Sequence, residues 1–115
     1  GGYFENTSLL LLHSTGAKSG QTRVNPLASL INGDRYVVIA SKGGAPTHPD
    51  WYYNVVANSV VQVELGTETF EATATVANEP ERTDLYQEMI KLNAGFASYL
   101  DKTTRVIPVV ILTRN

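Results

Sequence analysis

One segment constrains the fold more than any other: TRVNPLASLINGDRYVVIAS, residues 22–41, in which two β-prone runs flank Asn32-Gly33. Asn-Gly followed by Asp is the turn chemistry of a tight hairpin, because both central residues can adopt positive φ. Pro26 interrupts the first run. Since proline cannot donate to a strand ladder, we expect it at a sheet edge or a bulge.

The rest of the chain shows the same β organisation with helical insertions. Four successive leucines, Leu9–Leu12, predict a buried strand, and alternating residues on both sides of Gly66 predict a second hairpin. Pro108 implies an edge position or an irregularity in the closing strand. The leucine strand spans 7–16, the second hairpin spans 60–66 and 69–76, and the closing strand spans 105–113, while helices are predicted at 49–59 and 79–95. Hairpins joined by isolated helices exclude a doubly wound parallel sheet, so we expect a mostly β fold, a small antiparallel barrel with two or three helices packed on it.

Size and composition bound the functional classes. A chain of 115 residues with a hydrophobic fraction of 43% predicts a single folded domain over residues 1–115. Its net charge of -2 provides no broad field for nucleic acid, so any anion site must be local. The chain has no cysteine, which excludes disulfides, thiolate metal sites and cysteine nucleophiles and fits the cytoplasm.

The start of the chain bears on membranes. Leu9–Leu12 is too short to cross a bilayer, and no signal peptide precedes it. Gly1-Gly2 leads into a strand within a few residues, as expected if a natural N-terminal arm has been removed. Because this arm is expected to be missing, the sequence allows a peripheral membrane contact as one alternative.

The segment STGAKSGQTR, residues 14–23, has the composition of an anion-binding loop. It is not a Walker loop, because Ala17 stands where that pattern needs glycine and a strand follows instead of a helix. Glycine nevertheless lets backbone N–H groups turn toward an anion, and Lys18 and Arg23 supply positive charge. A solvated turn explains these residues equally well.

A second such loop is ASKGGAPTHPDWYYN, residues 40–54. Its lysine and paired glycines could close on the same anion, and the positive end of the helix that starts near Pro49 would face it. Trp51 is close enough to form a flat wall, whereas Tyr52 and Tyr53 fit better as packing residues.

Other chemistries find little support. His13 and His48 lack the partners of a metal site, so we interpret the first as a hydrogen-bonded strand-end residue and the second as part of a helix cap. No G-x-S-x-G elbow or carboxylate pair is present. Binding residues without an evident acid, base or nucleophile favour a bound redox cofactor, which brings its own chemistry.

Three segments, HSTGAKSGQTRVNPL, VVIASKGGAPTHPDWYYNVVANSVVQVELG and DKTTRVIPVVIL, resemble in order and spacing the deazaflavin (F420)-dependent nitroreductase and quinone reductase family. The resemblance implies a split β-barrel of the FMN-binding type that binds coenzyme F420. It also implies hydride transfer from reduced F420 to a quinone, a nitro compound or another oxidised aromatic acceptor, by a protein that we expect to be a monomer.

The resemblance further implies which residues form the site. The anionic tail of F420 would be bound by Lys18, Ser19, Gly20 and Arg23. The ring would lie near Pro26, Ile39, Ser41, Lys42, Gly43, Gly44, Trp51 and Asn54. The hydroxyl groups of Ser41 and Tyr99 would serve the catalytic proton transfer.

Departures from the family pattern leave alternatives open. Ala17 replaces an arginine common in relatives, which removes one tail contact, and Ala28 replaces a tyrosine of the nitroimidazole-reducing members. Of a spaced tyrosine set, only Tyr99 keeps its phenol. Because these tyrosines are reduced in number and no residue is committed to proton transfer, a non-catalytic F420 carrier is an alternative. A second alternative keeps the barrel and binds FMN in place of F420.

Overall fold

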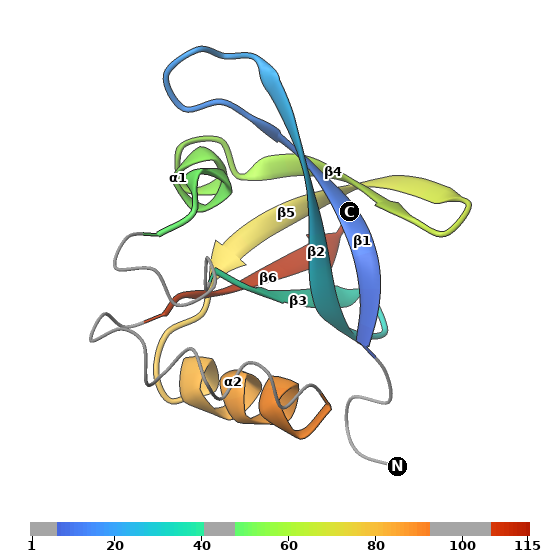
Figure 1. Ribbon diagram of the computed structural model, residues 1–115, viewed down its shortest axis with the longest axis vertical. Coiled ribbons are helices and arrows are strands. Elements are labelled where there is room, and N and C mark those ends of the chain that lie inside the picture. The colour runs from blue at the N-terminus through green and yellow to red at the C-terminus, as the bar shows by residue number, and fades with distance from the viewer. Residues whose placement is uncertain (1–6, 41–47, 93–106) are drawn as a thin grey trace.

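The computed structural model describes residues 7–40, 48–92 and 107–115, in which six antiparallel strands close into a barrel in the order β1-β2-β3-β6-β5-β4 (Figure 1). The strands are β1 (Thr7–Thr15), β2 (Thr22–Asn32), β3 (Arg35–Ile39), β4 (Val60–Leu65), β5 (Glu68–Val76) and β6 (Val109–Arg114). The helices are α1 (Asp50–Ala57) and α2 (Glu81–Leu92). Pairing of β1 with both β2 and β4 closes the barrel. The expected mostly β barrel is confirmed.

The β2–β3 hairpin forms where the Asn-Gly signal predicts it, but its turn is shifted by one residue. Asn32 pairs with Arg35, so the two central residues are Gly33 and Asp34. Gly33 has a φ of 59°, a conformation that glycine adopts without steric cost. The second predicted hairpin also forms, with Gly66 at a φ of 61°.

Both prolines occupy positions that a strand ladder tolerates. Pro26 pairs with Leu11 of β1 on one side. On its other side β2 pairs with β3 only from Ser29 to Asn32, so no strand lies beside Pro26 there that would need its missing N–H. Pro108 lies just before the first residue of β6, and its carbonyl accepts a hydrogen bond from Ala40 N–H at 2.9 Å. The expected edge or irregular positions are confirmed.

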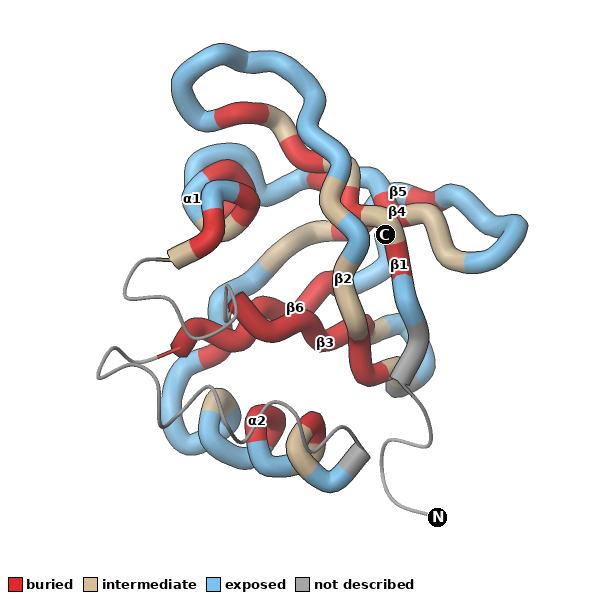
Figure 2. Tube along the Cα trace, in the orientation of Figure 1, coloured by how far each residue is buried: buried red, intermediate tan, exposed pale blue. Residues whose placement is uncertain are grey.

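Two hydrophobic clusters lie on opposite faces of the barrel wall. Both draw on β3 and β6, along which Figure 2 shows mostly buried residues. Alternate residues of one strand serve the two clusters: Val38 faces the barrel interior, whereas Val37 belongs to the cluster under α2. Met89 of α2 is fully buried in the outer cluster. Helix α2 therefore covers the outer face of β2, β3 and β6, and the barrel is packed on both sides there.

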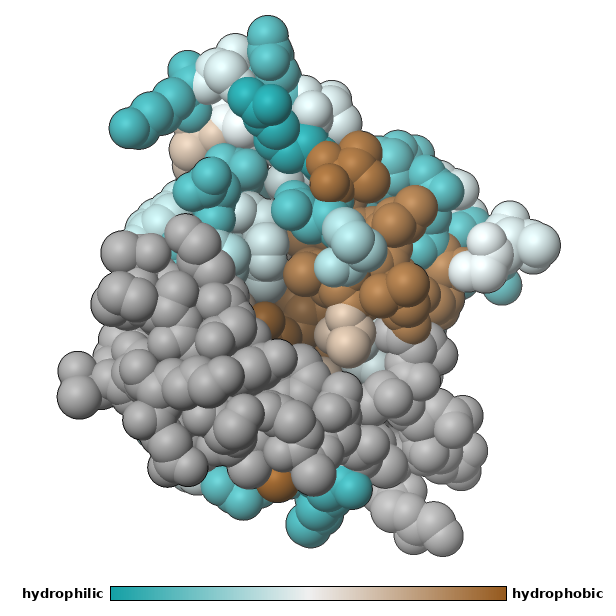
Figure 3. Space-filling view, in the orientation of Figure 1, coloured by the Kyte–Doolittle hydropathy of each residue, from teal (hydrophilic) through white to brown (hydrophobic). Residues whose placement is uncertain are grey.

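The outer face of β1 and the adjoining part of β2 carries exposed apolar side chains, which gather on one side of the molecule (Figure 3). Leu10 and Leu12 point inward and are buried, so the alternation turns Leu9 outward, where it is 68% exposed. Val24 on β2 is 50% exposed. The four-leucine run thus serves two faces, and the prediction that all four leucines are buried is wrong for Leu9.

Helix α1 begins after Pro49, as predicted, because proline is tolerated where the helix N–H groups have no internal partner. The cap residue Pro49 makes no side-chain cap hydrogen bond. His48, expected to contribute to this cap, packs its ring against Tyr52 with the ring centroids 4.9 Å apart. None of the helices within 7–40, 48–92 and 107–115 is long and apolar enough to cross a membrane.

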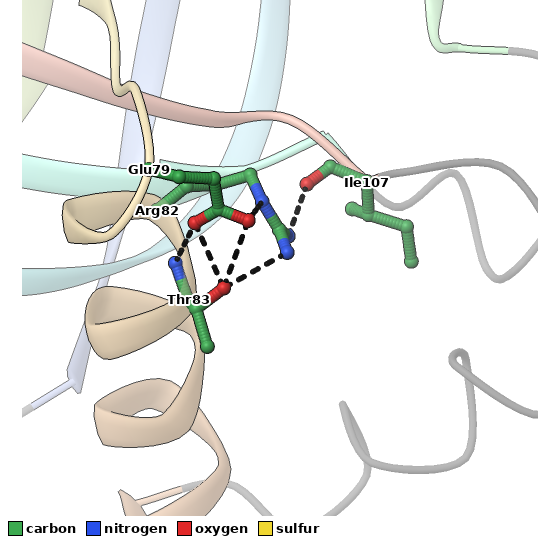
Figure 4. A network of polar contacts seen from close by, with 4 residues as sticks. All are labelled: Glu79, Arg82, Thr83 and Ile107. Atoms are coloured by element: carbon green, nitrogen blue, oxygen red, sulfur yellow. Dashed lines mark hydrogen bonds and ion pairs between the residues drawn. The ribbon is translucent and has the colours of Figure 1, made fainter.

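Helix α2 is fastened at its start by a polar network (Figure 4). Glu79 accepts hydrogen bonds from the hydroxyl and the backbone N–H of Thr83, at 2.8 and 2.9 Å, and these bonds lower the pKa of the Glu79 carboxyl. Arg82 contacts the same carboxylate and donates to the carbonyl of Ile107 at 3.1 Å. The network therefore joins the start of α2 to the chain that enters β6.

Candidate functional site

The site is a cavity between the tip of the β1–β2 hairpin and helix α1. The hairpin projects beyond the barrel and its tip lies beside α1 (Figure 1). The cavity has a volume of about 920 Å³, which is within the range of small-molecule and cofactor sites. Its lining residues are Gly16, Ala17, Lys18, Ser19, Thr22, Arg23, Val24, Asn25, Asp50, Trp51, Tyr53 and Asn54.

The hairpin tip, residues 16–21, is shaped by its own backbone. Gly16 N–H donates to the carbonyl of Gln21 at 2.7 Å, and Gly20 N–H donates to the carbonyl of Gly16 at 3.0 Å. Gly20 has a φ of 71°, and a Cβ added at Gly16 would lie 2.6 Å from Ser19 Oγ. Gly20 therefore occupies a conformation that favours glycine, whereas a side chain at Gly16 would require Ser19 to move.

Two asparagines of the α1 region bind the hairpin. Asn54 Oδ1 accepts a hydrogen bond from the backbone N–H of Ala17 at 3.0 Å. Asn58, the residue after the last turn of α1, donates from Nδ2 to the carbonyl of Thr15 at 3.4 Å. Asn54 is buried, with 8% of its surface exposed. These contacts fix the helix against the hairpin and so define the cavity between them.

The charge around the cavity is unevenly paired. Four cationic side chains in the described ranges contact a carboxylate within 4.0 Å: Arg35, Arg82, Lys91 and Arg114. The two others in those ranges, Lys18 and Arg23, have no such partner, and both line the cavity. Asp50 lines it too, in the first turn of α1. The hairpin side of the cavity therefore presents positive charge, which suits an anionic ligand.

The structure brings together part of the site expected from the sequence. Lys18, Ser19, Arg23, Trp51 and Asn54 line the one cavity, and Gly20 lies in the hairpin tip. Pro26 is exposed on β2, outside the cavity lining. Ile39 is buried in the cluster under α2, on the outer face of the barrel wall. Ser41, Lys42, Gly43, Gly44 and Tyr99 lie outside the described residues.

Sequence reasoning missed several lining residues. Asp50 and Tyr53 share a helix with Trp51 and Asn54, so a helical-wheel reading of 50–57 could have found them once α1 was placed beside the hairpin. Thr22, Val24 and Asn25 follow from the hairpin register, since they flank Arg23 at the start of β2. The missing information was how the helix docks, and no local pattern supplies it.

His13, expected to be hydrogen-bonded, is so: its Nε2 lies 2.6 Å from Glu64 Oε1 on β4. This contact links β1 to the neighbouring strand that closes the barrel. Within the residues that the structure describes, no group of three or more His, Asp or Glu side chains could hold a metal ion. His13 thus has a structural partner in the barrel wall.

The family match and the similar proteins all point to the same kind of enzyme. Residues 1–114 match the family described as F420H(2)-dependent quinone reductase. An F420H(2)-dependent quinone reductase of Mycobacterium tuberculosis is 43% identical over 108 residues, 91% of this chain and 72% of the relative. A second M. tuberculosis protein, a putative F420H(2)-dependent quinone reductase, is 32% identical and covers 96% of this chain and 93% of its own.

Solved structures agree. An F420-H2 dependent reductase superposes with a TM-score of 0.83 at 37% identity, covering 97% of this chain and 99% of its own. A protein solved as a domain-swapped dimer gives a TM-score of 0.84 at 38% identity, covering 94% and 81%. A haem storage protein of Vibrio cholerae, at 13% identity and a TM-score of 0.73 over 94% and 82%, shares the fold.

Proposed function

The chain belongs to the F420H(2)-dependent quinone reductase family, and from this premise we propose that it binds coenzyme F420 between the β1–β2 hairpin tip and α1 and reduces a quinone. F420 is the cofactor of this family. The observation that carries the placement is the cavity itself: the two unpaired cations of the described chain, Lys18 and Arg23, line it together. The alternative occupant of the barrel, FMN, carries a single phosphate and makes less use of two separate cations.

The residues of the cavity fit the cofactor. F420 has a flavin-like ring and a tail that carries a phosphate and glutamates, so it presents both a flat aromatic surface and several negative charges. Lys18 and Arg23 would hold the tail through charge-assisted hydrogen bonds. Trp51, 4% exposed, lines the cavity from α1 and would exclude water along one wall. Asp50 would repel an anion placed near it and thus favours the hairpin side for the tail.

When bound, reduced F420 supplies the hydride that, together with one proton, converts a quinone to a hydroquinone. The chain's own part is to bind, orient and desolvate. We propose the hydroxyl groups of Ser41 and Tyr99, both outside the described residues, as the proton source. Replacing Tyr99 by Phe tests this assignment: we expect turnover to fall more than F420 affinity, and an equal loss of both would reassign the residue to cofactor binding or packing.

Two measurements test the proposed function. Titration of the protein with F420, followed by fluorescence polarisation, should saturate in the micromolar range, on the order of 1–10 μM. Reduced F420 should then be oxidised in the presence of the protein and a soluble naphthoquinone, and far more slowly without either. Absence of binding at about 100 μM F420 would refute the cofactor assignment, and binding without turnover for any quinone would favour a carrier instead.

Acceptor range and assembly are further parts of the proposal. We propose a quinone in preference to a nitro compound, because Ala28 stands where nitroimidazole-reducing relatives carry tyrosine. Parallel assays with a naphthoquinone and a nitroimidazole should show higher kcat/KM for the quinone.

We also propose a monomer, although one relative was solved as a domain-swapped dimer. Light scattering across a concentration series distinguishes the two, and a constant mass of two chains would refute the monomer.

A further inference from the structure

Asn54 joins helix α1 by a hydrogen bond to the hairpin tip that carries Lys18. Its Oδ1 accepts the backbone N–H of Ala17 at 3.0 Å, and Ala17 directly precedes Lys18. Because an N–H donates, the carbonyl oxygen of the Asn54 amide faces the tip, and this hydrogen bond uses one of the two lone pairs of that oxygen. With 8% of its surface exposed, the side chain is held in this orientation by its surroundings.

The other hydrogen bonds of the tip are internal to it. Gly16 bonds to Gln21, Gly20 bonds back to Gly16, and Gln21 N–H donates to Ser19 Oγ at 3.2 Å. These bonds fix the shape of the tip but do not attach it to the helix. In the described ranges, the hydrogen bond from residues 16–21 to α1 is the one between Ala17 and Asn54.

Resting on the proposed function, we propose that Asn54 is a positioning residue that acts on the cofactor through Ala17 and Lys18. The shape of the tip is set internally, whereas its hydrogen bond to α1 comes from Asn54. Asn58 holds the neighbouring Thr15 outside the tip, so Asn54 is the side chain that fixes the Lys18 side of the cavity relative to the helix. This role differs from direct cofactor contact, which the family resemblance implies for Asn54.

A double-mutant cycle separates the two roles. We expect Asn54→Ala to weaken F420 binding about tenfold, since a mispositioned Lys18 loses its charge-assisted bond to the tail. If Asn54 acts through Lys18, adding Asn54→Ala to the Lys18→Ala variant should weaken F420 binding by less than about a further twofold. Effects that multiply in the double variant, to about a hundredfold, would overturn the proposal in favour of independent contact.

Ala17→Pro removes the donor from the other side of the same hydrogen bond and leaves Asn54 in place. Positioning predicts that this variant reproduces the affinity loss of Asn54→Ala, whereas direct contact by Asn54 predicts nearly wild-type affinity. It also keeps the test available if Asn54→Ala fails to fold. Asn115→Ala is the matched control, because it removes asparagine side-chain hydrogen bonds outside the cavity lining.

Hydrogen exchange of the cofactor-free protein gives a readout that does not depend on F420. We expect peptides covering residues 16–21 to lose protection in Asn54→Ala and Ala17→Pro and to keep it in Asn115→Ala. Unchanged exchange in both tip variants would overturn the positioning role, whatever the ligand. Failure of wild-type protein to bind F420, with the exchange change present, would refute the proposed function alone.

Discussion

At the scale of single residues, the informative property is which cations lack a partner. Arg35 and Arg114 each contact a glutamate at 3.1 and 2.8 Å, whereas Lys18 and Arg23 meet no carboxylate in the part of the chain that the structure describes. An exposed cation with no partner gains most when an anion arrives, because no existing pair must be broken first. Binding energy should therefore be concentrated at these two side chains.

Lys18→Ala should weaken F420 binding by about tenfold or more, the value of one charge-assisted hydrogen bond. Fluorescence titration at two ionic strengths measures it, and the wild-type affinity should fall with salt more steeply than that of the variant, because salt screens the lost interaction. Lys91→Ala is the control, since that lysine pairs with Glu88 on α2. Equal affinity in Lys18→Ala and wild type would place the tail elsewhere.

The single tryptophan provides an internal probe of the same site. Trp51 is the one tryptophan of the chain and it lines the cavity. Bound F420 should quench its emission in proportion to occupancy, because the deazaflavin ring would lie within energy-transfer range. The same F420 titration into a solution of a free tryptophan analogue, at the absorbance of the protein sample, measures the loss of emission that is due only to light absorbed by F420. Binding seen by polarisation without any quenching beyond that correction would contradict the placement beside α1.

At the scale of elements, local chemistry predicted most of what formed. Alternation and turn residues, which act over a few positions, predict the strand before Gly16, the two predicted hairpins and the start of α1 after Pro49. The turn at Gly33-Asp34 is shifted because Asn32 still gains a strand pairing with Arg35. Local propensity locates a turn but does not decide between adjacent registers when one register adds a pair.

Helix α2 provides a pH prediction. The hydroxyl of Thr83, and then its backbone N–H, lower the pKa of the Glu79 carboxyl below 4.5. A group whose pKa is lower in the folded state stabilises the fold above its unfolded pKa, and this contribution is lost as the pH falls through the folded pKa. The Tm of wild type should thus fall more steeply than that of Glu79→Gln between about pH 5 and about pH 3.

Thermal melts of both proteins across that range, followed by circular dichroism, measure the difference. Glu88→Gln is the control on the same helix, since its carboxylate contacts the exposed Lys91, and it should keep the wild-type slope. Parallel curves for wild type and Glu79→Gln would show that the network of Figure 4 contributes no acid-dependent stability.

At the scale of the whole molecule, contacts between distant segments could not be predicted from local sequence patterns. The antiparallel barrel could be predicted, but the pairing of β6 with both β3 and β5 depends on edges that meet only after folding. The whole run Tyr36–Ala40 is buried, because its inner face lines the barrel and its outer face lies under α2. Alternation therefore could not show that Ile39 faces away from the cavity.

The same two-sided packing separates stability from binding, and Met89→Ala tests this. Met89 is fully buried under α2, so its truncation should lower the free energy of unfolding by about 2–5 kcal/mol. The outer cluster lies across the barrel wall from the interior, and α2 lies at the other end of the molecule from the hairpin tip (Figure 1). F420 affinity of the folded variant should therefore match wild type.

Chemical denaturation measures the free energy of unfolding, and fluorescence titration measures the F420 affinity. Leu9→Ala is the control, because Leu9 is 68% exposed and its truncation should change stability by less than about 0.5 kcal/mol. A folded Met89→Ala with affinity as weak as Lys18→Ala would mean that the outer cluster and the cavity are energetically coupled.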